Sequence, residues 1–172
     1  AEATGGLLDG LRAGRVQSDI AAVRAERCRA VDDRDRVLVG IDTDERRAKS
    51  QARAVANLPN ASESVTALLM HAFGDNPEGA SVGQVGAVRR AKELLEAEGV
   101  ETELVEGSIE PATALIKTAD ERDVDLICVS RRKRSPTGKV IFGSTTQSVL
   151  LGTDRPVMSV GIGDYGGVHT ED

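Results

Sequence analysis

The sequence is poor in aromatic residues and in cysteine, and it has no long apolar run. Aromatic side chains make up 2% of the 172 residues and Trp is absent, which argues against a surface on which nucleobases stack. Cys28 and Cys128 stand far apart without a CxxC or Cys/His cluster, so neither a zinc site nor a disulfide framework is indicated. No segment approaches about 18 consecutive apolar residues, so none is expected to span a membrane.

The chain also lacks an excess of positive charge. Its net charge is −6 and its isoelectric point is about 5.1, which argues against general nucleic-acid binding. No signal peptide is visible, so we expect a cytoplasmic protein. The chain begins at Ala1, which fits either removal of an initiator Met or a piece of a longer protein.

Hydrophobic residues make up 40% of the chain, and they form short runs that alternate with segments of helical period. The expected strands are Val37–Ile41, Val65–Phe73, Val100–Val105, Asp125–Val129 and Pro156–Ile162. The expected helices begin at Asp44, Val82, Pro111 and Gly143, and Gly99 ends the second of them. Strict alternation of this kind predicts an α/β fold, an open parallel sheet with helices on both faces.

The pattern divides the chain into three parts. Residues 1–34 are expected to be an N-terminal appendage, with a short helix from Ser18 and little packing of residues 1–17 on the core. Residues 35–163 form the α/β domain, and residues 164–172 are a Gly-containing tail. Cys128 is expected to be an inert core residue and His71 a structural one.

In an open parallel sheet, ligands bind beyond the carboxyl ends of the strands, where the strand order switches. That rule selects Asp42, His71 with Ala72, and the loop from Ser130. The loop carries five positive charges, Arg131, Arg132, Lys133, Arg134 and Lys139. It leads into a helix start at Gly143, Ser144 and Thr145, where backbone N–H groups favour an anion. The alternative is an exposed loop whose basic side chains pair with the acidic surface.

Residues 36–162 resemble the universal stress protein family. The resemblance rests on VLVGID, LLMHAF, the turn with Gly107 and Pro111, DLICVS, the Gly143-Ser144 pair and DRPVMSV. It implies a Rossmann-like, five-stranded fold with strand order 3-2-1-4-5. One branch of the family binds ATP or AMP through a loop that reads Gly-x-x-Gly, nine residues, then Gly-Ser or Gly-Thr. By the same resemblance, Asp42 contacts the nucleoside and Ala72 lies beside the adenine.

The first two glycine positions of that loop fall on Ser130 and Lys133, and Gly143-Ser144 matches. Glycine allows close approach of the backbone to phosphate, so its loss favours a signalling or stress-response module that does not bind ATP strongly. The alternatives are an ATP- or AMP-binding stress protein that uses loop 130–145, and a regulatory domain of a larger protein. An enzyme is not expected, because no nucleophile–base pair, complete phosphate loop or paired carboxylates are present. Weak ATP hydrolysis stays open.

The expected partners are a second copy of the chain and an unidentified protein. Members of the family often pair through the last strand, which is Pro156–Ile162 here. A long apolar edge strand leaves backbone groups unpaired and invites another chain. We therefore expect a homodimer through this strand, with no cofactor beyond a possible ATP or AMP and no metal.

Overall fold

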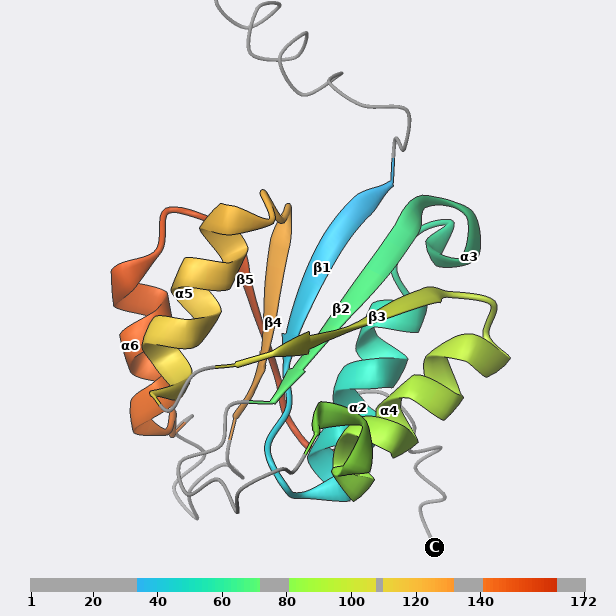
Figure 1. Ribbon diagram of the computed structural model, residues 1–172, viewed down its shortest axis with the longest axis horizontal. Helices are drawn as coiled ribbons and strands as arrows, with labels where there is room; N and C mark the ends of the chain where they lie inside the picture. Colours follow the sequence, from blue (N-terminus) through green and yellow to red (C-terminus); the bar gives the residue numbers. More distant parts are fainter. Residues whose placement is uncertain (1–33, 72–80, 108–109, 132–140, 164–172) are drawn as a thin grey trace, which may run out of the picture. The chain divides into compact units, whose positions relative to one another are not determined.

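The computed structural model describes residues 34–71, 81–107, 110–131 and 141–163. Five strands form one sheet in the order β3-β2-β1-β4-β5, and every neighbouring pair is parallel (Figure 1). This confirms the predicted α/β fold and strand order. The strands are β1 (Asp35–Gly40), β2 (Val65–His71), β3 (Glu101–Glu106), β4 (Leu126–Ser130) and β5 (Val157–Val160).

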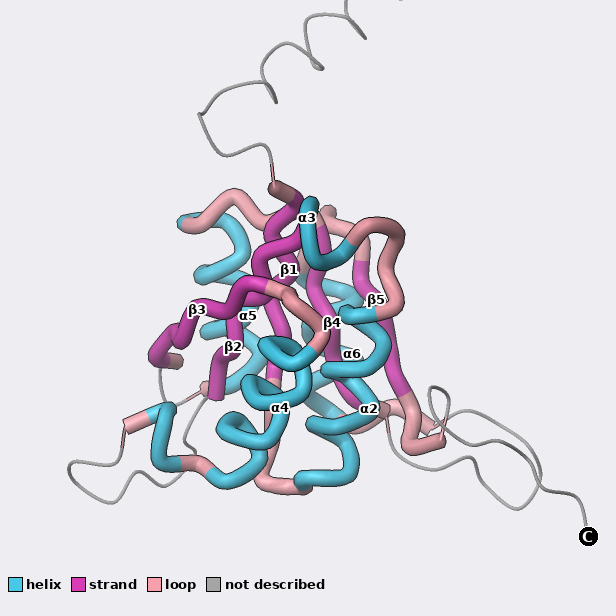
Figure 2. The backbone as a smooth tube through the Cα atoms, turned by 90° about the vertical axis from the view of Figure 1, so that its right-hand side faces the viewer, coloured by secondary structure: helices cyan, strands magenta, loops and turns pink. Residues whose placement is uncertain are grey.

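Helices cover both faces of the sheet. Helices α2 (Glu45–Ala56) and α4 (Gly86–Ala97) lie on one face, and α5 (Pro111–Glu121) and α6 (Ser144–Gly152) lie on the other (Figure 1). Figure 2 shows α2 and α4 side by side in front of the strands. Strands β2 and β4 are apolar along most of their length, and β1 is apolar from Val37 onward, because both faces of the sheet are covered there.

The side chains of β1 alternate between two cores, one on each face of the sheet. Val37 and Val39 point to the α2 and α4 side, whereas Leu38 belongs to the α5 and α6 side. Small side chains let α2 approach the sheet closely, since Ala48 and Ala52 are at most 1% exposed. The low aromatic content of the chain therefore matches a core of Ala, Val, Leu and Ile.

Sequence signals locate several helix ends correctly. Asp44 is the N-cap of α2 and accepts a hydrogen bond from the Arg46 backbone N–H at 2.9 Å. Pro111 occupies the first position of α5, as expected of proline. Gly99 follows α4 with a φ of +76°, a left-handed conformation that glycine adopts without strain.

The structure corrects the segment predicted as one helix from Val82. It contains a 3-10 turn, η1 (Val82–Gln84), and then α4, separated by Val85 in an extended conformation. The Gln84 side chain accepts a hydrogen bond from the Ser81 backbone N–H at 3.2 Å, which favours the separate turn. A short helix, α3 (Ala61–Ser64), was not expected between α2 and β2.

Several predictions concern residues outside the described part of the chain. They are the helix from Ser18, the packing of residues 1–17, the tail 164–172, and most of the basic loop. Within the described residues, no helix is long and apolar enough to cross a membrane.

Candidate functional site

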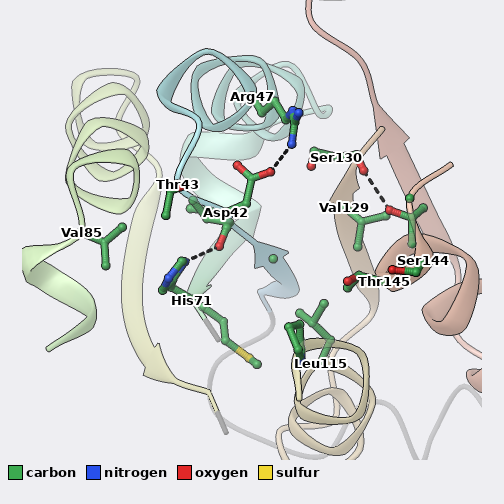
Figure 3. Close-up of a pocket in the computed structure, with 16 residues that line it drawn as sticks. Asp42, Thr43, Arg47, His71, Val85, Leu115, Val129, Ser130, Ser144 and Thr145 are labelled. Atoms are coloured by element: carbon green, nitrogen blue, oxygen red, sulfur yellow. Dashed lines mark hydrogen bonds and ion pairs between the residues drawn. The ribbon is translucent and has the colours of Figure 1, made fainter. Parts of the chain in front are cut away.

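A pocket of about 480 Å³ opens at the carboxyl ends of β1, β2 and β4 (Figure 3). Its polar side is formed by residues that follow the strands and by the start of α6. These are Asp42, Thr43, Arg47, His71, Ser130, Ser144, Thr145 and Thr146. The rest of the lining is largely apolar: Gly40, Ile41, Met70, Val85, Pro111, Leu115, Val129 and Gly143. A largely apolar pocket with a few convergent polar groups suits a small organic ligand.

The pocket lies where the strand order switches. The β1–β4 register ends with Val39 opposite Cys128, whereas the β1–β2 register continues to Gly40 opposite Met70. The chain leaves β1 toward α2 on one face and leaves β4 toward α6 on the other, which opens a crevice between the two strands.

Two side chains, one on each face of the sheet, pack against the strands beneath this crevice. Gln51 is 1% exposed, and its Nε2 donates to the Gly40 carbonyl at 2.9 Å and to the Cys128 carbonyl at 3.4 Å. Leu115 approaches Gly40 from the other face, and a Cβ on Gly40 would lie 2.9 Å from Leu115 Cδ1. Glycine at this position therefore brings α5 close to the pocket floor.

Asp42 follows β1 and is held by two donors. Its Oδ1 accepts from the Asp44 backbone N–H at 2.9 Å, and its Oδ2 accepts from Arg47 Nη1 at 2.5 Å (Figure 3). Arg47 Nε also lies 3.7 Å from Asp44 Oδ2. Burial acts to raise the pKa of Asp44, but the Arg46 N–H and the charges of Arg46 and Arg47 outweigh it and lower the pKa.

His71 ends β2, the strand next to β1, and lies beside Asp42 in the pocket (Figure 3). It is buried, and its Nδ1 lies 2.7 Å from the Ile41 carbonyl oxygen. A carbonyl can only accept, so Nδ1 carries the proton and a neutral ring presents Nε2 as an acceptor. The hydrogen bond joins the ends of β1 and β2, and it supports the structural role expected for His71.

The start of α6 forms the remaining polar wall. Gly143 is its N-cap, with no side-chain hydrogen bond to the first turn, so the first backbone N–H groups of the helix are not capped by that residue. Thr146 Oγ1 donates to the Ser130 carbonyl at 2.9 Å, which ties the end of β4 to this helix start. The helix dipole adds a partial positive charge here.

Ser130 occupies the first of the two lost glycine positions. It ends β4 and pairs with Val160 of β5. Among the described non-glycine residues, positive φ occurs at Asn60 and Asp123, so Ser130 keeps an ordinary backbone. A glycine at this position would therefore leave more space for a ligand, and it is not needed for a left-handed backbone conformation.

The pocket brings together most of the predicted site residues. Asp42, Ser130, Gly143, Ser144 and Thr145 all line it. Ala72 and Lys133 lie outside the described residues, so their predicted roles stay predictions.

Arg131, expected to add charge near the anion, does not line the pocket. Its backbone N–H donates to the Val160 carbonyl at 2.8 Å, and its guanidinium packs over Gly161, within 2.7 Å of where a Cβ would stand. The side chain therefore lies against the end of β5.

Sequence reasoning missed Arg47 and Gln51. Arg47 is the third residue of α2, three positions after the N-cap Asp44, and a side chain at that position can reach back over the helix start. That spacing was an available signal. Nothing in the sequence marks Gln51, because polar residues of a helix usually face solvent.

Cys128 is a buried thiol in the middle of β4. Burial raises the pKa of the Cys128 thiol to about 12, so this residue is the inert core residue that was predicted. The described residues contain no cluster of three or more His, Cys, Asp or Glu side chains that could hold a metal ion.

The fold and the site together define an open α/β domain with a pocket at its topological switch point. Comparison with known proteins makes this specific. The sequence model of the universal stress protein family matches residues 33–161. The chain therefore belongs to this family, as the sequence motifs indicated.

Individual relatives agree. A universal stress protein of Mycolicibacterium smegmatis is 30% identical over 88 residues, 51% of this chain and 68% of that protein. A universal stress protein structure from Archaeoglobus fulgidus is 29% identical, with a TM-score of 0.55 over 73% of this chain and 98% of its own. A universal stress protein in complex with cAMP shares the fold at 22% identity and a TM-score of 0.57, covering 75% of this chain and 98% of its own.

Proposed function

We propose that this protein is a stress-response module whose pocket binds an adenine mononucleotide of the AMP class with modest affinity. One observation carries the proposal. Asp42, which can accept hydrogen bonds from ligand hydroxyls, and the α6 helix start, which can bind phosphate, line the same pocket. A binding role accords with the absence of a nucleophile–base pair in the sequence.

The pocket dimensions support a ligand of this size. Pockets for small molecules commonly measure about 300–1,000 Å³, and this one measures about 480 Å³. Its apolar wall, with Val85 and Leu115, suits the face of a heterocycle. The fold also accommodates such ligands elsewhere, since a universal stress protein from Archaeoglobus fulgidus has a structure in complex with dAMP and another member one in complex with cAMP.

The altered loop supports modest affinity and a preference for one phosphate. Ser130 narrows the space that glycine would leave beside a ligand, and Lys133 replaces the second glycine. A lysine supplies charge through a flexible side chain, which loses entropy on ordering and is screened by salt. The backbone wrapping that a triphosphate needs is thereby weakened, whereas the α6 start can still receive a single phosphate.

The test places a negative charge at the phosphate end. Ser144→Asp repels phosphate, yet it suits the helix dipole and leaves folding intact. Ser148→Asp adds the same charge at an exposed position of α6 that does not line the pocket. We expect calorimetry to show AMP binding by the wild type and by Ser148→Asp, and about tenfold or greater loss in Ser144→Asp. ATP and sulfate, at low and high salt, are the comparison ligands.

Two results would contradict the proposal. One is absence of AMP binding to the wild type at millimolar concentration. The other is equal AMP affinity in Ser144→Asp and Ser148→Asp, which would place the phosphate elsewhere. Tight, salt-insensitive ATP binding would contradict the expected preference for one phosphate and favour the alternative of an ATP-binding stress protein.

We also propose that two copies of the chain associate through the outer edge of β5, the last strand of the sheet that the described residues form. β5 lies at one end of the sheet and its sequence VMSV carries no charge. The opposite edge, β3, reads ETELVE and carries three glutamates. Charged side chains protect an edge from pairing, whereas an uncharged edge admits another strand. The frequent occurrence of homodimers in the family supports association of two copies.

A further inference from the structure

The pocket contains a positively charged residue, Arg47, beside Asp42, and the sequence prediction of the site did not include it. We propose that Arg47 is a specificity-determining residue, one that neutralises and orients Asp42 so that the pocket accepts an anionic ligand. The inference rests on the proposed nucleotide function and concerns the same pocket.

The contacts show how Arg47 orients Asp42. One carboxylate oxygen accepts from the Asp44 N–H, and the other accepts from Arg47 Nη1 (Figure 3). A carboxylate has about four acceptor positions, so each oxygen keeps one for a ligand. The Asp42 side chain is 40% exposed, which leaves it reachable from the pocket. Arg47 thus fixes the carboxylate without covering it.

Arg47 also lies close to a second carboxylate. Its side chain is 28% exposed, and its Nε lies 3.7 Å from the carboxylate of the N-cap Asp44. The guanidinium therefore lies near two carboxylates that follow β1. By contrast, the neighbouring Arg46 side chain is 70% exposed, lies 3.6 Å from Asp44 and does not line the pocket.

The positive charge of Arg47 compensates the negative charge of Asp42, and this affects which ligands the pocket can bind. Without Arg47, the Asp42 carboxylate would stand uncompensated in a pocket that must receive a phosphate. Two unit charges about 10 Å apart, at an effective dielectric constant near 20, change a binding constant by about tenfold. An uncharged ligand is not subject to this repulsion. Arg47 therefore separates anionic from neutral ligands of otherwise identical shape.

The experiment compares AMP with adenosine on the full chain. We expect Arg47→Met to lower AMP affinity by about tenfold at low salt. Adenosine affinity should change by less than about threefold, because the Asp44 backbone N–H still holds the Asp42 carboxylate. The AMP loss shrinks at high salt, because salt screens the repulsion. Arg47→Lys keeps the positive charge and retains an AMP-to-adenosine ratio close to that of the wild type.

Arg46→Met is the matched control. It removes the same charge one position away, outside the pocket, and is expected to leave the AMP-to-adenosine ratio unchanged. Retained adenosine binding shows that Arg47→Met is folded. If Arg47→Met lowers the affinity for both ligands equally, or for neither, the role proposed for Arg47 is wrong, whereas the proposed function still stands. Absence of AMP and adenosine binding to the wild type would overturn the proposed function together with it.

Discussion

Gln51 shows how one residue can support the whole site without touching a ligand. Its amide joins the Gly40 and Cys128 carbonyls where β1 and β4 separate. Its Oε1 is buried and has no hydrogen-bond partner. A buried polar group without a partner is costly, so the Oε1 of Gln51 offsets part of the stability that its two donated hydrogen bonds contribute. We infer that it satisfies the Gly40 carbonyl, which lies beyond the last residue pair of the β1–β4 register.

Replacement of Gln51 tests this interpretation. Gln51→Leu removes the donor from two carbonyls, and also removes the unpartnered Oε1, so we expect a net loss of about 1 kcal/mol in the free energy of unfolding. Gln51→Glu cannot donate when ionised and buries a charge, so it should cost more, about 3 kcal/mol at pH 7. Urea denaturation measures both. A Gln51→Leu variant as stable as the wild type would show that the amide bonds contribute nothing.

The elements were predictable where local chemistry decides them. Continuous apolar runs identified β1, β2 and β4, and Asp44, Pro111 and Gly99 marked the helix ends correctly. The break at Val85 was not predictable, because its apolar spacing fits an unbroken helix and the Ser81–Gln84 contact depends on side-chain geometry. Helix α3 is a single short turn whose sequence, ASES, has no apolar period.

The N-cap of α2 gives a prediction at the scale of one element. Asp44→Ala removes the acceptor for the Arg46 N–H, and we expect the free energy of unfolding to fall by about 1 kcal/mol at pH 7. Asp44→Asn keeps an acceptor oxygen, so it should lose less. Chemical denaturation of the three proteins measures the order. Equal stability of Asp44→Ala and the wild type would contradict the capping role.

The same residue predicts a pH dependence. Burial acts to raise the pKa of Asp44, but the hydrogen bond from Arg46 and the charges of Arg46 and Arg47 lower it below the ordinary value of 3.8. A carboxyl whose folded-state pKa is lowered stabilises the fold above its unfolded-state pKa, and this contribution is lost as the pH falls through the folded-state value. The stability advantage of the wild type over the Asp44→Asn variant should therefore shrink below about pH 4. A constant difference between about pH 7 and about pH 3 would contradict this.

At the scale of the molecule, topology determined how much of the site could be predicted. Parallel strands bring their carboxyl ends to one edge of the sheet, so Asp42 and the segment after β4 could be placed together from sequence order alone. The contribution of Arg47 depends on the direction in which one helical side chain points. That of Gln51 depends on where the β1–β4 register ends. The spacing of Arg47 from the N-cap Asp44 allows its side chain to reach back, but the direction that it takes is seen only in the fold, and nothing in the sequence marks Gln51.

The proposed dimer depends on which backbone groups β5 leaves free. Ile127 donates to the Pro156 carbonyl and Arg131 donates to the Val160 carbonyl. In a parallel ladder this alternation turns the backbone groups of Val157 and Ser159 away from β4, toward the open edge. Ser159→Pro therefore removes a donor from the free edge and spares the β4–β5 hydrogen bonds. Proline is tolerated on edge strands for this reason.

We expect light scattering to show a dimer for the wild type at micromolar concentration and a monomer for Ser159→Pro. Ser159→Ala keeps the backbone N–H and serves as the control, so it should stay dimeric. Circular dichroism of Ser159→Pro should match the wild type, because the lost donor does not belong to the sheet of one copy. A wild type that is monomeric throughout this range, or a Ser159→Pro variant that is folded and still dimeric, would place association at another surface. The charged edge of β3 disfavours strand pairing there, so a persistent dimer would indicate a surface other than the two sheet edges.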